Sequence, residues 1–436
     1  MQKHLRSFLF SSIFITSIAS ASEKENPSSP APKVERYKAM EALAKGLFYL
    51  EDLYVEPKKV SYEDMVFHAL KGIVDRLDPH TVVMPRKAFD QLTIDTQGKF
   101  GGIGIIVSTE QNRLIVVSPI DDTPAAKAGI QSGDEIIAID GTKLSDMTGN
   151  QSTEKMRGKP NTEITLTIKR KDEPKLLDFT MKREIIKVRS VRGQMLTRGI
   201  LYARISSFQD NTAKELKEHI VKNAKNIKGL ILDLRDNPGG LLDQAVQVSD
   251  LFIESGLIVS TVGRTNENVE REFAHKRGTY KDFPIVTLIN GGSASASEIV
   301  AGALQDHERS LVMGTTSFGK GSVQTLISLP DRSGLKITVA RYYTPKDRSI
   351  QALGIKPDIV VTTTTPKEEK KRKEADLKGH IDSEDLSRLA ESGGIVSELQ
   401  KWPGSFAKDR QVKTAYTYLR GWAKSGGNKN RAENKL

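Results

Sequence analysis

The chain has 436 residues, of which 37% are hydrophobic and 28% charged, a composition typical of a folded multidomain protein. It contains no cysteine, which excludes thiol catalysis, disulfides, zinc–cysteine sites, iron–sulfur ligation and a cysteine-linked lipid anchor. Its 66 basic and 55 acidic residues give a formal net charge of +11, an excess too diffuse to indicate nucleic-acid binding. Any chemistry must therefore use oxygen or nitrogen groups.

The first 21 residues have the three parts of a secretory signal peptide. Lys3 and Arg6 form a basic start, an apolar run follows from Phe8 to Ile18, and the sequence ASA ends the segment. The apolar run is much shorter than the ~20 residues that span a bilayer. We therefore expect residues 1–21 to be a signal peptide and the protein to be exported, periplasmic or associated with the cell envelope. An uncleaved anchor is the alternative.

The rest of the chain divides into five segments by composition. Residues 22–33 are rich in Ser and Pro and indicate a linker. Residues 34–97 carry apolar side chains at helical spacing and predict an N-terminal helical region. Residues 98–184 contain glycines and β-branched runs and predict a mainly β domain. Residues 185–361 alternate strands and helices, and residues 362–436 predict a C-terminal helical extension, charged first and aromatic later.

Two units of the fourth segment repeat one design. GLILDLRDNPGG is followed by LLDQAVQVSDLFI, and FPIVTLINGGSAS is followed by ASEIVAGALQDH. Each unit reads as a buried strand, a turn with glycines and an amphipathic helix, which predicts an α/β core with mostly parallel pairing. The segment VQTLISLPDRSGLKITVARYY then predicts a hairpin, because Pro, Asp and Gly favour a turn.

The segment NGGSASASEIV places three serines where the second strand meets its helix. A helix N-terminus presents unpaired N–H groups, so a serine hydroxyl there lies beside donors that can hold a developing oxyanion. The turn from Asn237 to Gly240 supplies more N–H groups at the same edge of the sheet. These serines could instead cap the helix or allow tight packing.

A serine nucleophile needs a base. If a helix starts at residue 295, His307 lies about 18 Å along its axis, and no other histidine has a favourable context. A lysine can serve if burial lowers its pKa from about 10.4 toward 7. Lys320 in SFGKGSVQ is the best choice, and strand alternation would put Gln324 on the same face to orient it. An exposed loop lysine is the plain alternative.

Two other known sequence motifs, the P-loop and S-x-x-K, are matched only in part, and we reject both. The pattern G-x-x-x-x-G-K from Gly314 to Lys320 lacks the Ser or Thr that binds Mg²⁺ in a P-loop, and a strand follows it. The pattern S-x-x-K from Ser317 to Lys320 opens a helix in β-lactamase-like enzymes, whereas here it is flanked by glycines and precedes a strand. We expect no cofactor and no metal.

Several long motifs, in this order, resemble one known family. They are LDPHTVVMP, DTQGKFGGIGI, SPIDDTPAAKAGIQSGDEIIAIDG, MRGKPNT, LILDLRDNPGGLL, NGGSASASEIVAGALQD, TSFGKGSVQT and VARYYTPKDRSIQALGIKPDI, within residues 34–361. The chain is similar to the carboxyl-terminal processing (tail-specific) proteases, which are serine peptidases with a PDZ domain. The resemblance implies a crotonase/ClpP-like α/β protease core at 185–361 and an inserted, mainly β PDZ domain at 98–184.

The resemblance also implies roles for individual residues. It implies a catalytic Ser295, the middle serine of SASAS, with Lys320 as base and Gln324 as the orienting residue. It implies oxyanion donors at the backbone of Gly240 and Ala296, with Gly239 sharing the role.

In the PDZ segment, GGIGI resembles the loop that binds a terminal carboxylate through backbone N–H groups. Gly102, Ile103, Gly104 and Ile105 are the expected peptide-binding residues, although a glycine-rich strand start would look the same. Arg157, in MRGK where the family usually has LRG, is a hypothesised link between tail binding and the active site. A surface salt bridge is its plain alternative.

We expect an exported serine endopeptidase that binds unstructured protein C-termini and cleaves them through an acyl-enzyme. A homodimer through the N- and C-terminal helices, and an adaptor or activator protein, are further partners to test. One rival is a non-catalytic PDZ scaffold with a vestigial protease core, and another is a crotonase-like acyl-CoA enzyme.

Overall fold

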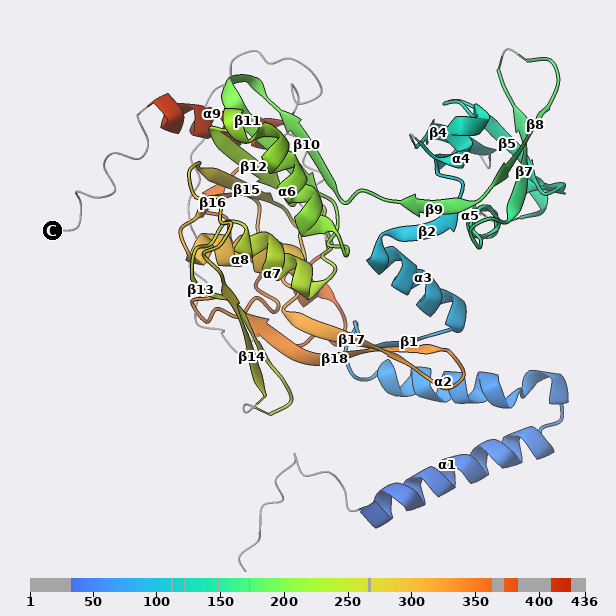
Figure 1. Ribbon diagram of the computed structural model, residues 1–436. Coiled ribbons are helices and arrows are strands. Elements are labelled where there is room, and N and C mark those ends of the chain that lie inside the picture. Colours follow the sequence, from blue (N-terminus) through green and yellow to red (C-terminus); the bar gives the residue numbers. More distant parts are fainter. Residues whose placement is uncertain are drawn as a thin grey trace, which may run out of the picture. The chain divides into compact units, whose positions relative to one another are not determined.

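The computed structural model describes eight stretches of the chain (Figure 1). These are residues 33–110, 113–120, 122–147, 149–171, 173–265, 268–362, 372–382 and 409–424. The predicted signal peptide and nearly all of the linker lie outside them. The chain divides into two compact units, residues 1–69 and 70–436, which are described separately.

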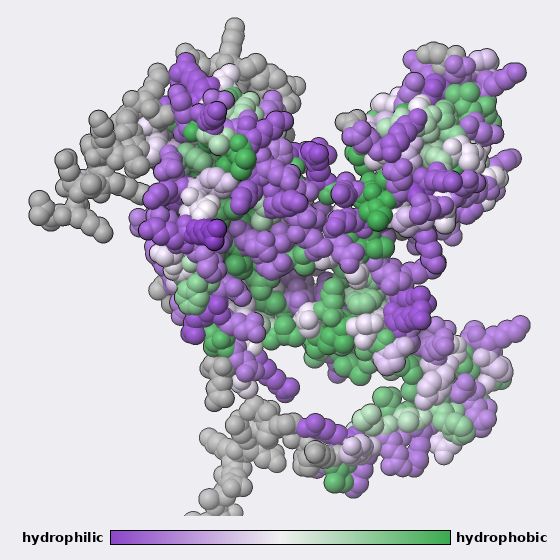
Figure 2. Space-filling view, in the orientation of Figure 1, coloured by the Kyte–Doolittle hydropathy of each residue, from purple (hydrophilic) through white to green (hydrophobic). Residues whose placement is uncertain are grey.

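The first unit is helical where it is described. It holds α1 (Lys33–Leu53), η1 (Pro57–Lys59) and the start of α2 (Tyr62–Val74). Pro57 opens η1, as expected of a residue that cannot continue a preceding helix. Large apolar side chains of α1 are exposed, among them Tyr37, Met40 and Phe48 (Figure 2).

The segment predicted to be wholly helical, 34–97, contains one strand. Val82–Met84 forms β1, which pairs antiparallel with β18 (Gly334–Tyr343), and α3 (Arg86–Gln97) follows. Two adjacent valines favour the extended backbone there, and a ready-made partner strand outweighs the helical pattern around them.

A sheet with its own core fills most of 98–184. Its strands are β3 (Ile105–Glu110), β4 (Arg113–Pro119), β5 (Glu135–Ile139), β6 (Thr142–Lys143), β7 (Glu163–Lys169) and β8 (Leu177–Lys182). The order is β3-β4-β5-β7-β8, with β6 on β5, so β3 is an edge strand. Ile164, Leu166 and Ile168 alternate inward on β7. The helices are α4 (Pro124–Ala128), which is capped by Gly129, η2 (Leu144–Asp146) and α5 (Gly149–Met156).

Both ends of this segment meet in a separate two-stranded sheet. β2 (Lys99–Gly102) enters the PDZ segment and β9 (Glu184–Lys187) leaves it, and the two pair antiparallel.

The segment from residue 185 to 361 is built on a six-stranded sheet. It contains β10 (Val191–Met195), β11 (Ile200–Ile205), β12 (Gly229–Asp233), β15 (Ile285–Ile289), β16 (Ser310–Gly314) and β19 (Ile359–Val360), in that order. All pairs from β11 onward are parallel, and β10 is antiparallel. The predicted α/β core with mostly parallel pairing is confirmed; its likeness to crotonase and ClpP stays a prediction.

Helices cover both faces of this sheet (Figure 1). The side chains of α6 (Thr212–Asn223), α7 (Leu242–Asp250) and α8 (Ala296–Asp306) share one core with inward residues of β11 and β12. The side chains of α9 (Arg410–Lys424) pack on the opposite face with alternate residues such as Ile231. The two repeated units are thus β12 with α7 and β15 with α8, as predicted. Short turns η3 (Thr197–Gly199) and η4 (Ala224–Asn226) join neighbouring elements.

A second sheet lies beside the core sheet. It has the order β1-β18-β13-β14, with β13 at Gly256–Val262 and β14 at Val269–Ala274. β17 (Ser322–Ser328) pairs antiparallel with β18, which confirms the predicted hairpin.

Of the predicted C-terminal helical extension, the structure describes η6 (Glu374–Asp376) and α9. Trp402 and Phe406, which contributed to that prediction, lie outside the described residues. Within the described ranges no helix is both long and apolar enough to cross a bilayer.

Candidate active site

Ser295 stands at the turn between β15 and α8. Its φ of 55° and ψ of −115° are unusual for a residue with a side chain, and such strain is often found at functional sites. The hydroxyl of Ser293 donates to Leu234 O at 2.8 Å and that of Ser297 to Asn237 O at 3.0 Å, and both side chains are buried. Ser295 is only partly buried. Two of the three serines therefore brace the turn, whereas the side chain of Ser295 is left partly exposed.

The glycine turn after β12 lies directly against this serine. Ala294 N donates to Asn237 O at 3.0 Å. A Cβ placed on Gly239 would lie 2.8 Å from Ser295 Cβ and 3.1 Å from Ala296 N. The two turns thus meet at one edge of the core sheet, as predicted from the carboxyl ends of neighbouring parallel strands.

The predicted oxyanion donors differ in availability. The N–H groups of Gly240 and Ala296 donate to no other group in the described part of the chain. The N–H of Gly239 is already bound to Asn237 Oδ1 at 2.9 Å, so its predicted share of the role does not fit this arrangement. The asparagine side chain two residues earlier takes the donor, as Asx turns commonly do.

Lys320 lies in the loop between β16 and β17, and a buried carboxylate fixes that loop to the serine. Glu298 Oε1 accepts Ser317 Oγ at 2.6 Å and Gly319 N at 2.7 Å. Glu298 Oε2 accepts Ser295 N at 2.7 Å and Lys320 N at 2.9 Å. Glu298 was not among the residues predicted from the sequence, although S-x-x-E is the signature of a capping box at a helix start.

Burial and, to a smaller extent, the nearby charge of Lys336 lower the pKa of Lys320 to about 8, against the opposing charges of Glu374, Glu298 and Asp78. Burial also raises the pKa of Glu298 to about 7, although its four hydrogen bonds oppose that rise. The predicted depression of the lysine pKa by burial is thus present, and near neutral pH a share of Lys320 is uncharged.

Tyr342 of β18 contacts both Ser295 and Lys320. Its hydroxyl donates to Lys320 O and lies in hydrogen-bond contact with the Ser295 side chain, and its ring is fully buried. Among the residues the structure describes, no hydrogen bond joins Ser295 Oγ directly to Lys320 Nζ. Tyr342 therefore spans the space between the nucleophile turn and the lysine loop.

We expected Gln324 to orient Lys320, but in the part of the chain that the structure describes no hydrogen bond joins these two residues. Its Nε2 donates to Ser322 Oγ at 2.9 Å and Thr338 Oγ1 at 3.3 Å. Lys320 precedes β17, and the β17–β18 register shifts between Val323 and Gln324. Strict alternation therefore does not carry from Lys320 to Gln324, which is why the pattern misplaced the amide.

A second buried carboxylate, missed by the sequence analysis, lies behind the lysine loop. Glu374, fully buried in η6, accepts His80 Nε2 at 2.7 Å and Gln351 Nε2 at 3.0 Å. Gln351 Oε1 in turn accepts Gly321 N at 2.9 Å. His80 is thus engaged by a carboxylate, and His307 Nε2 bonds Leu257 O at 2.7 Å, away from the serine.

The predicted peptide-binding loop precedes the edge strand β3. Gly104 has φ 77°, and a Cβ there would lie 2.4 Å from Thr123 Cβ, so glycine is required. Ile103 is buried and its carbonyl accepts Ala125 N at 2.9 Å, whereas Gly102 pairs with Glu184 in the β2–β9 sheet.

Arg157 follows α5. Its guanidinium lies 4.6 Å from the centroid of the Phe100 ring, a cation–π contact. Phe100 is on β2, so Arg157 touches the strand that enters the PDZ segment.

Comparison with known proteins identifies the family of the chain. Residues 199–361 match the model of peptidase family S41, and residues 101–181 match the PDZ domain model. The chain is 46% identical to a carboxy-terminal-processing protease of Bartonella bacilliformis over 82% of this chain and 83% of that protein. It is 35% identical to one from Synechocystis sp., over 72% and 74% respectively. A solved photosystem II D1 C-terminal processing protease aligns with 25% identity and a TM-score of 0.43, over 73% of this chain and 92% of that one. The chain therefore belongs to the carboxy-terminal processing proteases of peptidase family S41 and carries a PDZ domain.

Proposed function

We propose that the protein is a serine endopeptidase in which Ser295 is the nucleophile and Lys320 its base. The observation that carries this proposal is the shared carboxylate oxygen that holds both residues, together with burial of the lysine. Neutral Lys320 takes the Ser295 hydroxyl proton as Oγ attacks the scissile carbonyl, and Gly240 and Ala296 N–H stabilise the oxyanion. The ammonium then protonates the leaving amine, which leaves an acyl-enzyme.

Water completes the cycle. Lys320, neutral again after protonating the amine, accepts a proton from the attacking water. It then returns that proton to Ser295 Oγ as the ester bond breaks and the acid product leaves, which regenerates the serine hydroxyl and the neutral lysine. Gln324 Nε2 is held by Ser322 and Thr338, so Gln324 would orient the lysine through Oε1.

The PDZ domain would select the substrate. An unpaired edge strand can accept an extended peptide by β-augmentation, and β3 is such an edge, directly after Gly102–Ile105. We infer that a substrate C-terminus binds along β3, and that Arg157 relays this binding through its contact with Phe100 on β2.

Purified variants test the function. The wild type is expected to cut an unstructured tail peptide, while Ser295→Ala and Lys320→Ala lose at least a thousandfold in kcat. Ser255→Ala, an exposed serine in the same domain, is the matched control and should keep full activity. Cleavage retained in both active-site variants would refute the mechanism. A wild type that cuts no tail peptide would instead favour the non-catalytic scaffold, although a scaffold has no need of a buried lysine with a lowered pKa.

We also propose export by residues 1–21 and self-association. Exposed apolar side chains on α1, such as Leu43 and Leu50, support a second copy as partner. Light scattering of the purified protein tests the dimer, and an N-terminal sequence beginning near residue 22 tests the cleaved signal. A requirement for an adaptor would show as peptide cleavage only after a second protein is added.

A further inference from the structure

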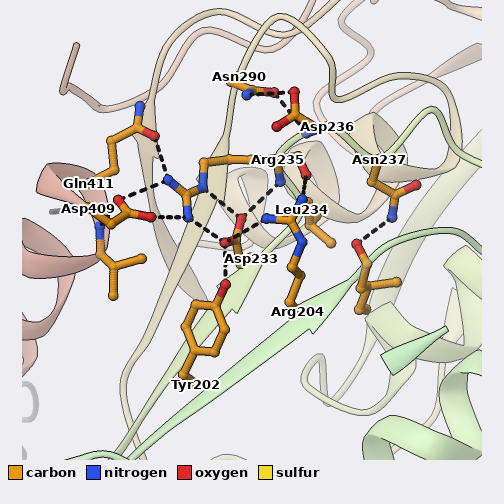
Figure 3. Close-up of polar contacts among 12 residues, drawn as sticks. Tyr202, Arg204, Asp233, Leu234, Arg235, Asp236, Asn237, Asn290, Asp409 and Gln411 are labelled. Carbon is orange, nitrogen blue, oxygen red and sulfur yellow. Dashed lines mark hydrogen bonds and ion pairs between the residues drawn. The ribbon is translucent and has the colours of Figure 1, made fainter. Parts of the chain in front are cut away.

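A cluster of charged side chains lies behind the glycine turn that carries Gly240 (Figure 3). At its centre the Arg235 guanidinium binds two carboxylates. Nε and Nη2 donate to Asp233 at 2.8 and 2.6 Å, and Nη1 and Nη2 donate to Asp409 at 3.0 and 2.8 Å. Gln411 Oε1 accepts Nη1 at 2.9 Å. All five hydrogen bonds are charge-assisted, the strong class, and four of them join the guanidinium to a carboxylate.

The cluster is buried and its charges balance. The Asp233 side chain is fully buried, and 10% of the Arg235 side chain is exposed. Arg204 Nη1 adds a second cation at 3.3 Å from Asp233 Oδ2. With two cations and two anions, loss of either carboxylate leaves an excess positive charge beside the buried Arg235 side chain, which is more costly than loss of a surface pair.

Arg235 leads directly into the oxyanion turn, and residues 235–237 each hydrogen-bond to a residue outside the turn. Arg235 O accepts Arg204 Nη2 at 3.0 Å. Asp236 N, at a positive φ of 56°, donates to Asn290 Oδ1 at 2.9 Å. Asn237 Nδ2 donates to Ile205 O at 3.0 Å. Asp236, Gly239 and Gly240 in this turn all have a positive φ. Such a turn does not hold its shape alone, so its geometry depends on these hydrogen bonds.

The second carboxylate comes from the far end of the chain. Asp409 immediately precedes α9, and its Oδ1 also accepts Val412 N at 3.0 Å, so it caps the helix. Gln411 Nε2 donates to Val361 O at 2.7 Å. Helix α9 packs on the core sheet through Val412 and Leu419, both fully buried. One side chain thus joins the docked helix to the residue before the oxyanion turn.

We propose that Asp409 and Gln411 are positioning residues of the active site: by holding Arg235, docked α9 fixes the turn that presents the Gly240 N–H. The inference rests on the proposed function, because it assigns a role in stabilising the oxyanion. It gives the C-terminal helix a part in catalysis although α9 covers the face of the sheet opposite α8, whose first turn carries the nucleophile.

The test compares Asp409→Asn with Leu419→Ala in the full chain. Asp409→Asn should lower kcat on a tail peptide at least tenfold with KM unchanged. It should weaken binding of a trialanine aldehyde, which forms an oxyanion on Ser295, by a similar factor, while the matching trialanine alcohol binds as before. Leu419→Ala removes packing on the same helix without touching Arg235, so it should lower Tm but keep kcat well below that temperature.

A kcat of Asp409→Asn equal to that of the wild type would overturn the inference. So would an equal loss of affinity for the aldehyde and the alcohol. A loss of kcat in Leu419→Ala as large as that in Asp409→Asn would overturn it as well. If Asp409→Asn does not fold, Gln411→Ala removes one Arg235 contact; a several-fold kcat loss supports the inference and no loss overturns it. A normal Asp409→Asn beside an inactive Ser295→Ala refutes only this inference, whereas an active Ser295→Ala refutes the function itself.

Discussion

Ser295 and Lys320 donate their backbone N–H groups to one atom, Glu298 Oε2, at 2.7 and 2.9 Å. The other carboxylate oxygen holds Gly319 N and Ser317 Oγ in the same loop. The start of α8 and the lysine loop are thus tied to a single buried side chain. The distance between nucleophile and base depends on a carboxylate whose four hydrogen bonds go to neither Ser295 Oγ nor Lys320 Nζ.

The first prediction concerns this carboxylate. In Glu298→Gln the side chain keeps its size, but its NH₂ group faces two N–H or O–H donors in place of an acceptor. We expect kcat to fall about 10²-fold, or about 2.7 kcal/mol, because the nucleophile and base lose their common anchor. Steady-state peptide cleavage measures the loss. Glu308→Gln, an exposed residue just beyond the same helix, should be normal, and a normal Glu298→Gln would show that the anchor is dispensable.

The second prediction concerns pH. Only neutral Lys320 can accept the serine proton, so kcat should rise with pH to a plateau above about 8, the pKa that burial gives this lysine. The charge of Glu374 raises the pKa of Lys320, so Glu374→Gln should move the rising limb to lower pH. Asp376→Asn, exposed in the same segment, should leave the profile in place. An unmoved limb in Glu374→Gln, or an acidic optimum in the wild type, would contradict the assignment.

The third prediction concerns stability. The pKa of Lys320 is about 8 in the folded protein against 10.5 ordinarily, so the unfolded chain binds the proton more tightly. The free energy of unfolding should therefore rise with pH between about 8 and 10.5, and below 8 the cost of burying the charge is fully present. Lys320→Met should stabilise the protein at pH 7 by about 1–3 kcal/mol and flatten this rise.

Urea unfolding at pH 7 and pH 10 measures the stability change. The exposed Lys356→Met is the control and should differ from the wild type by less than about 0.5 kcal/mol. A Lys320→Met variant less stable than the wild type at pH 7 would mean that the lysine contributes favourable contacts that outweigh its burial.

The fourth prediction separates backbone strain from close approach. Gly239 (φ 102°) and Gly278 (φ 91°) share a left-handed backbone, but a Cβ meets Ser295 Cβ at 2.8 Å at the first and nothing within 4 Å at the second. Gly278→Ala should cost about 1 kcal/mol of unfolding free energy and no activity. Gly239→Ala should pay the same strain and also displace the nucleophile, lowering kcat more than 100-fold. Equal activities in the two variants would show that the turn accommodates the added Cβ without displacing Ser295.

Much of this architecture could be predicted from the sequence, because its signals are local. The repeated pattern of strand, glycine turn and helix predicted the units β12 with α7 and β15 with α8. Short-range turn chemistry predicted the β17–β18 hairpin. The meeting of the NPGG turn with Ser295 followed from parallel strands ending at one edge.

What the sequence could not supply depends on long-range contacts. Asp409 lies 174 residues from Arg235, and nothing in its neighbourhood signals that pairing. The bulge in β17 turned Gln324 toward Thr338, because register is set by the partner strand and not by the strand's own pattern. The three serines are alike in sequence, and only the acceptors Leu234 O and Asn237 O distinguish the bracing pair from Ser295.

The most direct test of the central claim is the rate at which a fluorophosphonate labels the protein, with the labelled residue located by mass spectrometry. The account predicts a label on Ser295, a rate that rises with pH through about 8, and a loss of at least 100-fold in Lys320→Met. Labelling of Lys320→Met at the wild-type rate, or a label on another serine, would contradict a Ser295–Lys320 peptidase.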